Sequence, residues 1–186
     1  MSDTHRTPDP AQPEDPNRDR FLLSKGHAAP VLYSALARRG FFDPALLPTL
    51  RQLDSPLQGH PHREKLPGLD CSSGSLGQGL SVANGLALAA RRTGRSYRTY
   101  CLLGDGEVQE GQIWEAAMTA AQFSLDNVCA VVDDNGVQLD GPTKDIMDVE
   151  PLGAKFAAFG WEVLDIDGHS LAALRDAFRI AAARPA

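Results

Sequence analysis

The amino-acid sequence predicts an α/β fold in which a mainly parallel sheet is flanked by helices. Two short apolar runs, at 99–103 and 128–132, have the length and composition of buried strands. Between them, residues 110–122 carry apolar side chains at helical spacing, so the three segments form a strand–helix–strand unit. An apolar run at 161–166 and an amphipathic segment at 171–183 repeat the alternation. Such alternation is typical of sheets whose parallel strands are joined by crossover helices.

The N-terminal segment is predicted to be a disordered arm. Residues 1–19 contain four prolines among polar residues and offer almost no apolar side chain to bury. The domain is therefore expected to span residues 20–186. Its first ordered segment is a strand-like apolar run at 20–24.

Two helices and a long loop are expected next. The first helix begins near Pro30, whose fixed φ suits a first turn, and ends at Gly40. The Asp-Pro pair at 43–44 begins a second, shorter helix that runs to Leu53. Residues 58–73 form a loop punctuated by glycine and proline.

A helix rich in small residues is predicted over 74–92. Glycines there reduce helix stability, so we expect another group to approach closely. That group is either a neighbouring helix, or a cofactor or a second chain at the entry of the helix, residues 74–77. After the central unit, a further helix is expected over 151–159, before the strand at 161–166.

Composition places the chain among single-domain globular proteins. Its 186 residues can bury a substantial core, and 42% of them are hydrophobic against 23% charged. The net charge of −6 and the lack of a basic stripe argue against nucleic-acid binding, and no apolar run is long enough to span a membrane. Cys71, Cys101 and Cys129 show no paired spacing, so we expect structural thiols in a reducing compartment, the cytoplasm.

An acidic residue and an amide follow the two central strands. Asp105 lies between Gly104 and Gly106 directly after the first strand, and Asn135 follows the second. Ligands of parallel sheets bind outside the carboxyl ends of the strands. A carboxylate there would repel phosphates unless a cation bridged them, so the pattern indicates Mg²⁺ holding a diphosphate. The alternative is that Asp105 only caps the following helix and Asn135 only makes a turn.

Histidines lie in two of the predicted loops. His27 stands between the first strand and the first helix, and His60 and His62 lie in the long loop. A neutral imidazole can exchange protons with hydroxyls or donate a hydrogen bond to an anion. Each histidine taken alone is more simply a surface residue, and two histidines without further ligands are weak evidence for a metal.

Five sequence blocks follow one another along the chain. They are Ser24-Lys-Gly-His-Ala28, Gly59-His-Pro61, Pro67-Gly-Leu-Asp-Cys-Ser-Ser-Gly-Ser-Leu-Gly-Gln-Gly79, Gly104-Asp-Gly-Glu-Val-Gln-Glu-Gly-Gln112 and Asp133-Asp-Asn-Gly-Val-Gln138. Together they resemble the transketolases, and most of all the N-terminal, diphosphate-binding subunit of split transketolases, whose two halves are separate chains. The resemblance runs from about Arg18 to Ala186.

The resemblance implies a thiamine-diphosphate-binding fold that holds thiamine diphosphate with Mg²⁺ or a similar divalent cation. By position, Asp105 and Asn135 match the metal ligands, with the backbone carbonyl of Val137 as a third. Gly106 matches the residue that lies against the diphosphate. The small residues that match the segment contacting the aminopyrimidine ring are Gly74, Ser75 and Leu76.

The resemblance also implies roles for two histidines and a glutamate. His27 is similar to the histidine near the diphosphate and the reacting carbon, and His60 is similar to the one that bonds donor hydroxyls. Glu110 matches an interface glutamate linked to the partner's carboxylates. His62 and His169 match no functional position and are interpreted as structural.

The family's second half, the pyrimidine-binding domain, matches no segment of this chain. The resemblance therefore implies a subunit that transfers a two-carbon ketol unit from a ketose, or a ketose phosphate, to an aldose. We expect activity only with a partner chain, the C-terminal transketolase subunit with its pyrimidine domain, as an α₂β₂ heterotetramer. The family's early Ser-Gly-His-Pro-Gly-Gly-like block and a further strand at the other end are also unmatched, so we expect a version shortened at both ends.

Other functions stay open. A non-catalytic or degenerate module would bind the cofactor, or only a partner subunit, without turnover. A related thiamine-dependent carboligase subunit would share the same cofactor site. The 2-oxo acid dehydrogenase α subunits are another thiamine-dependent family, but the blocks at 59–61 and 73–79 are transketolase-like and argue against them.

Overall fold

The computed structural model describes residues 8–183, and residues 1–7 and 184–186 lie outside the described part. In chain order the elements are β1 (Arg20–Leu23), a 3₁₀ helix (Gly26–Ala28), α1 (Ala29–Arg38), a second 3₁₀ helix (Pro44–Thr49), α2 (Gln78–Arg92), β2 (Thr99–Gly104), a third 3₁₀ helix (Glu107–Gln109), α3 (Gly111–Gln122), β3 (Val128–Asp133), β4 (Val137–Gln138), β5 (Gly141–Pro142), α4 (Thr143–Ile146), α5 (Leu152–Ala158) and α6 (Leu171–Ala183). Within residues 8–183, no helix has the length and apolar character needed to cross a membrane.

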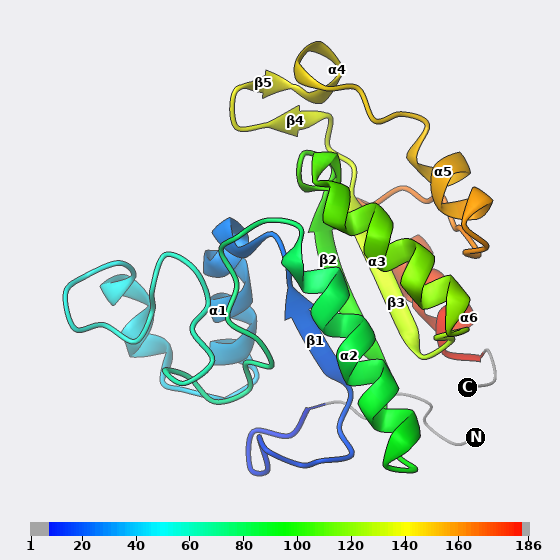
Figure 1. Ribbon diagram of the computed structural model, residues 1–186. Helices are drawn as coiled ribbons and strands as arrows, with labels where there is room; N and C mark the ends of the chain where they lie inside the picture. Colours follow the sequence, from blue (N-terminus) through cyan, green and yellow to red (C-terminus); the bar gives the residue numbers. More distant parts are fainter. Residues whose placement is uncertain (1–7, 184–186) are drawn as a thin grey trace.

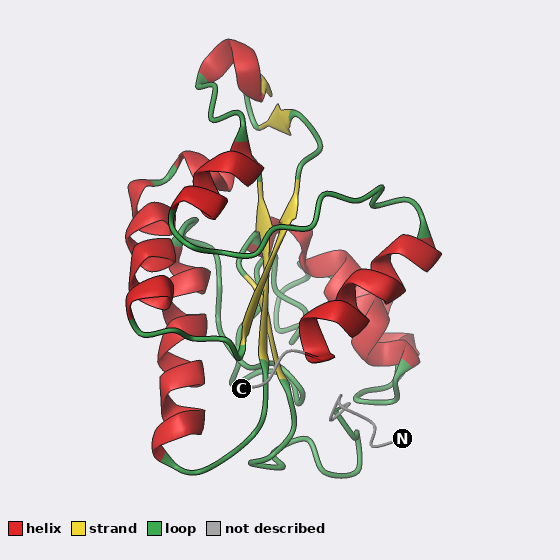
Figure 2. Ribbon diagram, turned by 90° about the vertical axis from the view of Figure 1, so that its right-hand side faces the viewer, coloured by secondary structure: helices red, strands yellow, loops and turns green. Residues whose placement is uncertain are grey.

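A parallel sheet of three strands, in the order β1-β2-β3, forms the centre of the domain (Figure 1). Cys101 of β2 lies opposite Leu22 of β1 and Ala130 of β3. Seen along its edge, the sheet has helices on both sides (Figure 2). The predicted α/β class, with a parallel sheet flanked by helices, is therefore confirmed.

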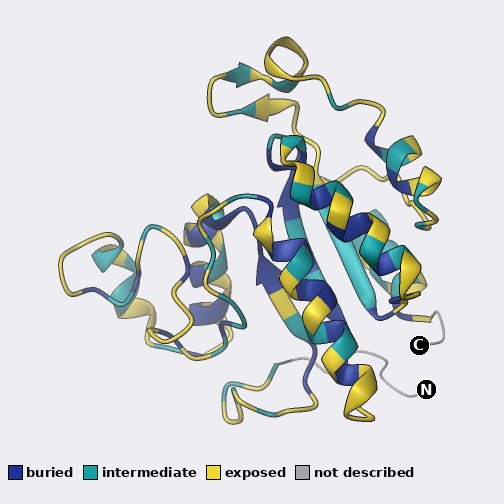
Figure 3. Ribbon diagram, viewed as in Figure 1, coloured by how far each residue is buried: buried dark blue, intermediate teal, exposed yellow. Residues whose placement is uncertain are grey.

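The main hydrophobic core fills the space between the sheet and the helices α2 and α3. Its buried members are Leu22, Leu80, Ala83, Cys101, Leu103, Val108, Ile113, Ala116, Ala117, Leu152 and Phe156. Asn84 Nδ2 of α2 donates a hydrogen bond of 2.8 Å to the carbonyl of Ala116 in α3. Small residues let the two helices approach closely, and each helix is buried on one side and exposed on the other (Figure 3). The packing expected against a neighbouring helix is observed for alanines of α2 and α3, whereas Gly79 lies against Ser24 and a Cβ at Gly85 would meet nothing within 4 Å.

A second, smaller core lies between α1 and the long loop that follows it. It consists of Ala29, Tyr33, Leu36, Phe41, Leu57, Leu66 and Leu69. Tyr33 Oη donates a hydrogen bond of 2.9 Å to the carbonyl of Gln58. This core anchors the loop that carries His60 to the helix that follows His27.

The strand predicted at 161–166 is wrong, because this segment forms no strand and pairs with no part of the sheet. Trp161 Nε1 donates a hydrogen bond of 3.0 Å to the carbonyl of Ala117 in α3, and its ring meets that of Phe156. The side chain of Val163 lies against Gly153 of α5. Trp161 and Val163 therefore lie against helices, whereas Leu164 and Ile166 are exposed.

Two predicted helices begin or end differently in the structure. Residues 74–77 precede α2, because Gly77 has a φ of +83°, which an α-helix does not allow, and the helix begins at Gln78. The helix expected over 43–53 is a 3₁₀ helix, Pro44–Thr49, and Arg51 and Asp54 beyond it have positive φ angles. The β4–β5 hairpin and α4 had no sequence signal and extend beyond the carboxyl ends of β2 and β3 (Figure 1).

The last residues of the predicted arm, whose described part is residues 8–19, are hydrogen-bonded to the domain. Arg18 and Asp19 are buried. Two nitrogens of the Arg18 guanidinium donate to the two carboxylate oxygens of Asp70, at 2.9 and 2.7 Å. Asp19 Oδ1 accepts a hydrogen bond from the amide of Arg98 at 2.8 Å, directly before β2. These residues therefore anchor the chain where it enters β1.

Candidate functional site

Asp105 lies at the carboxyl end of β2, in the turn before the third 3₁₀ helix. The residue is only 2% exposed. Its Oδ1 accepts a hydrogen bond from the amide of Gly106 at 2.8 Å, and its Oδ2 accepts one from the amide of Gly136 at 2.7 Å. The second bond crosses to the loop after β3. The 3₁₀ helix that follows has Gly106 as its N-cap and receives no side-chain cap bond, so Asp105 is not a helix cap. The structure thus brings the ends of the two strands together, as their parallel pairing requires.

Asn135 lies in the loop after β3, and its side chain is held at both ends. Its Oδ1 accepts a hydrogen bond from the amide of Val137 at 3.0 Å, which is the predicted turn. Its Nδ2 donates to Oδ2 of Asp133 at 3.3 Å, and the same oxygen accepts from Nζ of Lys25 at 2.8 Å. Asn135 and Val137 are exposed and are joined to the buried Asp105 through Gly136.

The carboxylates around these strand ends differ in electrostatic environment. The hydrogen bond from Lys25 holds the pKa of Asp133 below its usual value. Burial raises the pKa of Asp134, and the nearby carboxylates of Glu150 and Asp105 raise it further. The loop after β3 is therefore rich in negative charge on the side of Asp134, an environment that favours a bound cation.

The two predicted histidines are exposed and border the loop that precedes α2. His27 follows Gly26, where an added Cβ would stand only 2.7 Å from Oγ of Ser73. A Cβ at Gly74 would stand 3.4 Å from Cγ of His60. These close approaches at Gly26 and Gly74 place the segments that carry His27 and His60 beside the predicted aminopyrimidine segment, residues 74–76. Within that segment, Ser75 is exposed and Leu76 is half-buried.

Two further close approaches complete the candidate site. A Cβ at Gly77 would meet Cβ of Glu110 at 2.8 Å, so the exposed Glu110 lies against the start of α2. A Cβ at Gly106 would meet Cβ of Gln138 at 2.5 Å, so β4 lies directly over the turn that holds Asp105. At both positions a neighbouring side chain lies so close to the backbone that any Cβ would collide with it.

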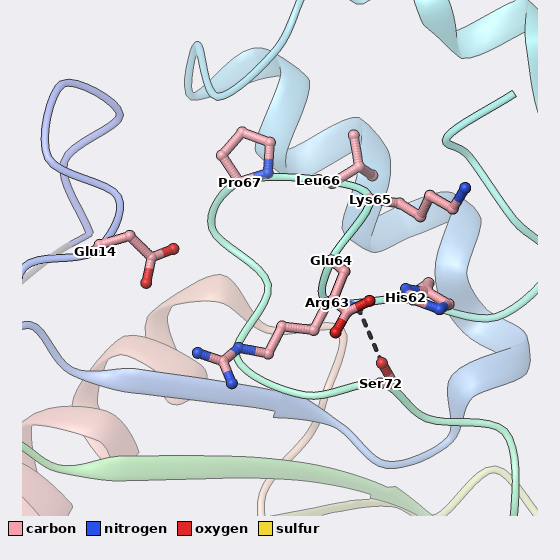
Figure 4. Close-up of a pocket in the computed structure, with 8 residues that line it drawn as sticks. All are labelled: Glu14, His62, Arg63, Glu64, Lys65, Leu66, Pro67 and Ser72. Atoms are coloured by element: carbon pink, nitrogen blue, oxygen red, sulfur yellow. Dashed lines mark hydrogen bonds between the residues drawn. The ribbon is translucent and has the colours of Figure 1, made fainter.

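A hollow of about 800 Å³ is lined by none of the predicted site residues (Figure 4). Its lining consists of Glu14, His62, Arg63, Glu64, Lys65, Leu66, Pro67 and Ser72. The charges are of both signs, so the hollow does not select an anion or a cation. Residues 8–183 contain no cluster of three or more His, Cys, Asp or Glu side chains arranged to hold a metal, so the pair formed by His60 and His62 gains no further ligand.

A family model described as "Transketolase, thiamine diphosphate binding domain" matches residues 1–186. The chain belongs to this family. An apulose-4-phosphate transketolase subunit of Actinobacillus succinogenes is 46% identical over 168 residues, which cover 90% of this chain and 61% of that protein. The 6-deoxy-6-sulfo-D-fructose transketolase subunit SqwG of a Clostridium species is 48% identical over 162 residues, covering 87% and 59%.

Solved transketolases share the fold of the chain. The transketolase of Campylobacter jejuni matches with a TM-score of 0.86 and 35% identity, over 92% of this chain and 29% of that one. A transketolase structure from Pichia stipitis matches with a TM-score of 0.88 and 34% identity, over 94% and 28%. The transketolase resemblance of the five blocks is therefore confirmed. The chain spans about three fifths of the length of the subunit relatives.

Four polar residues of this transketolase-family domain were not singled out from the sequence. Ser24, Lys25, Glu107 and Asp133 all lie inside the family blocks, and no local pattern distinguishes Ser24 and Glu107 from surface residues. Three of them are buried in the structure. The one signal in the sequence was a charged side chain directly beside a predicted buried strand, which applies to Lys25 and Asp133.

Proposed function

We propose that the protein is the diphosphate-binding subunit of a transketolase that depends on thiamine diphosphate and Mg²⁺. It would transfer a two-carbon ketol unit from a ketose donor to an aldose acceptor. The observation that carries the proposal is the buried carboxylate of Asp105, at the carboxyl ends of neighbouring parallel strands, in a chain that belongs to this family along its whole length.

The residues around Asp105 fit a divalent cation. Its carboxylate accepts hydrogen bonds from two neutral backbone amides, and none of the ion pairs formed by residues 8–183 includes it. A buried carboxylate without a cation is unfavourable, and a bound divalent ion would supply one. We assign Asp105, the side-chain oxygen of Asn135 and the backbone carbonyl of Val137 as the protein ligands, since Mg²⁺ prefers hard oxygen donors.

The other predicted residues are assigned by their places around this centre. When bound, thiamine diphosphate supplies the nucleophilic carbon and the electron sink of ketol transfer. The backbone of Gly106 would lie beside the diphosphate, and residues 74–76 would contact the aminopyrimidine. His27 would hold or move a proton near the reacting carbon, and His60 would bond the donor's hydroxyls, since an imidazole serves both tasks.

A partner chain is part of the proposal. Two similar proteins are named as subunits, and one of them is named for a phosphorylated sugar and the other for a sulfonated fructose. We therefore propose a partner that carries the pyrimidine domain, in a heterotetramer with Glu110 at the interface, and a ketose with an anionic group as the donor to test first. The cytoplasm is the proposed compartment, since the three cysteines are free thiols.

The proposal is tested by titrating thiamine diphosphate with Mg²⁺ into the full chain, with and without the pyrimidine-domain chain, by calorimetry. Asp105→Ala and the milder Asp105→Asn should each weaken binding by at least about a hundredfold, because the buried carboxylate supplies both charge and ligand. Asp176→Ala is the matched control, since Asp176 is exposed on α6 and its partners are exposed arginines. That control should bind like the wild type.

Ketol transfer is then assayed with each chain alone and with both together. Turnover only with both chains supports the proposal, whereas turnover by this chain alone would contradict the need for a partner. Cofactor binding without any turnover would favour a non-catalytic module. No binding in any combination would leave only a partner-binding role.

A further inference from the structure

Glu107 is a buried carboxylate at the junction of three backbone segments. The residue is 2% exposed. Its Oε1 accepts hydrogen bonds from the hydroxyl of Ser24 and from the amide of Gly77, the latter at 2.9 Å. Its Oε2 accepts a hydrogen bond from the amide of Gly104 at 3.2 Å. One side chain therefore satisfies donors from the end of β1, from the loop before α2 and from the end of β2.

Each of the three donors is a close neighbour in the sequence of a residue assigned above to the cofactor. Ser24 precedes His27, Gly77 follows Leu76, and Gly104 precedes Asp105. Glu107 bonds to all three segments and, being buried beneath them, has almost no exposed surface with which to contact a substrate. Its carboxylate therefore acts on the site through the backbone around it.

Ser24 extends this arrangement to the first turn of α2. Its Oγ accepts a hydrogen bond from the amide of Gly79 at 3.1 Å, while its own hydroxyl donates to Glu107. A Cβ at Gly79 would collide with the Ser24 side chain, so only glycine fits there. The loop before α2 is thus held at Gly77 by Glu107 and at Gly79 by Ser24.

We propose that Glu107 is a positioning residue for thiamine diphosphate: it fixes the aminopyrimidine segment, the segment before His27 and the metal turn relative to one another. This inference rests on the proposed function. Buried polar groups are almost always hydrogen-bonded, and a carboxylate with three donors is rigid because each bond restrains the other two. A site assembled from three loops needs such a restraint to hold its contacts within a fraction of an ångström.

Glu107→Gln tests the role with little change in shape. A glutamine side chain has one accepting oxygen and one donating NH₂ group, whereas the donors meet both oxygens of Glu107. In either orientation of the amide, the NH₂ group faces a backbone N–H, at Gly77 or at Gly104. That amide loses its acceptor and should exchange with deuterium about ten- to a hundredfold faster.

The experiment compares four full-length proteins: the wild type, Glu107→Gln, Ser24→Ala and Glu115→Gln. Glu115 is exposed on α3, so its variant makes the same chemical change without touching the site. Hydrogen exchange is followed at residues 74–79 and 102–106, with the amides of α3 as internal reference. The dissociation constant of thiamine diphosphate is measured at saturating Mg²⁺, with the partner chain present and below the unfolding temperature of every variant.

We expect faster exchange at Gly77 or Gly104 in Glu107→Gln, faster exchange at Gly79, whose amide loses its acceptor, in Ser24→Ala, and no change in Glu115→Gln. The dissociation constant of thiamine diphosphate should rise about tenfold in Glu107→Gln. Unchanged exchange at both Gly77 and Gly104 would overturn the restraint itself. Faster exchange with unchanged cofactor affinity, or faster exchange throughout α3, would overturn the positioning role and leave a general stabilising one. If the wild type itself binds no thiamine diphosphate, the proposed function fails. The restraint by Glu107 is tested separately, because hydrogen exchange is measured without reference to cofactor binding.

Discussion

Asp133→Asn should destabilise the protein more than Lys25→Met, although both substitutions remove the same ion pair. Nζ of Lys25 lies 2.8 Å from Oδ2 of Asp133, and the two side chains are 9% and 50% exposed. Removing the carboxylate leaves an ammonium group buried without its counterion. Removing the ammonium leaves a carboxylate that water already reaches, and methionine fills most of the buried volume of the lysine stem.

The magnitude follows from the unequal exposure. Breaking a fully buried ion pair by removing one partner costs about 3–5 kcal/mol. Because Asp133 is half exposed, solvent screens the pair, and we discount the loss for Asp133→Asn to about 1–2 kcal/mol. Lys25→Met should cost at most about 0.5 kcal/mol by the same reasoning. For a chain of this size, 1 kcal/mol corresponds to about 2–4 °C in Tm, so Asp133→Asn should lower Tm by about 2–8 °C.

Urea unfolding, followed by the fluorescence of Trp114 and Trp161, provides the assay. It is run without thiamine diphosphate and Mg²⁺, so that ligand binding does not contribute to the free energy of unfolding. The double variant completes a cycle, and it should be more stable than Asp133→Asn alone because its buried ammonium is gone. Equal losses for the two single variants, or a larger loss for Lys25→Met, would refute the reasoning.

The pH dependence supplies a second check with a defined sign. Lys25 lowers the pKa of Asp133 in the folded state, so the carboxylate's contribution is fully present above its unfolded pKa of about 3.9. It is lost as the pH falls through the lower, folded pKa. The difference between the wild type and Asp133→Asn should therefore be the same at pH 7 and pH 5 and should shrink only below about pH 4. A difference that disappears between pH 7 and pH 5 would point to another group.

Two further substitutions test the packing around the site and the anchor of the chain. Gly106→Ala should lower the free energy of unfolding by about 1–3 kcal/mol in urea titrations, because its Cβ would stand 2.5 Å from Cβ of Gln138 although a φ of −62° suits alanine. Gly111→Ala, whose Cβ would meet nothing within 4 Å, is its control, and equal losses in the two variants would contradict the steric explanation. Asp70→Asn should cost about 3–4 kcal/mol, because it leaves Arg18 without the carboxylate of a pair whose side chains are 4% and 6% exposed. A thermal and urea stability within about 1 kcal/mol of the wild type, which is typical of surface changes, would show that the Arg18 anchor is dispensable.

Local sequence patterns were sufficient to place most of the sheet and helices. The runs at 99–103 and 128–132 correspond to β2 and β3, and the amphipathic segment 171–183 corresponds to α6. Each segment is bounded by turn-forming residues, so its length can be predicted without knowing which elements it packs against. The run at 161–166 also contains four apolar residues, but Glu162 and Asp165 interrupt it, and its Trp161 side chain hydrogen-bonds to α3 while the segment pairs with no strand.

Some residues of the candidate site can likewise be predicted from local sequence patterns, whereas others are recognised only from tertiary contacts. The meeting of the loops that carry Asp105 and Asn135 follows from parallel strand order, which the alternation of strands and helices already indicates. The contact between Ser24 and Glu107 joins residues 83 apart in the chain, and that between Lys25 and Asp133 joins residues 108 apart. Periodicity reports which face of an element is apolar, whereas a buried polar group finds its partner only in the assembled structure. The residues that would contact the cofactor can therefore be predicted from their places after strands. The polar residues that hold the strand ends in place are identified only from the structure, in which Glu107 joins the segments at Ser24, Gly77 and Gly104.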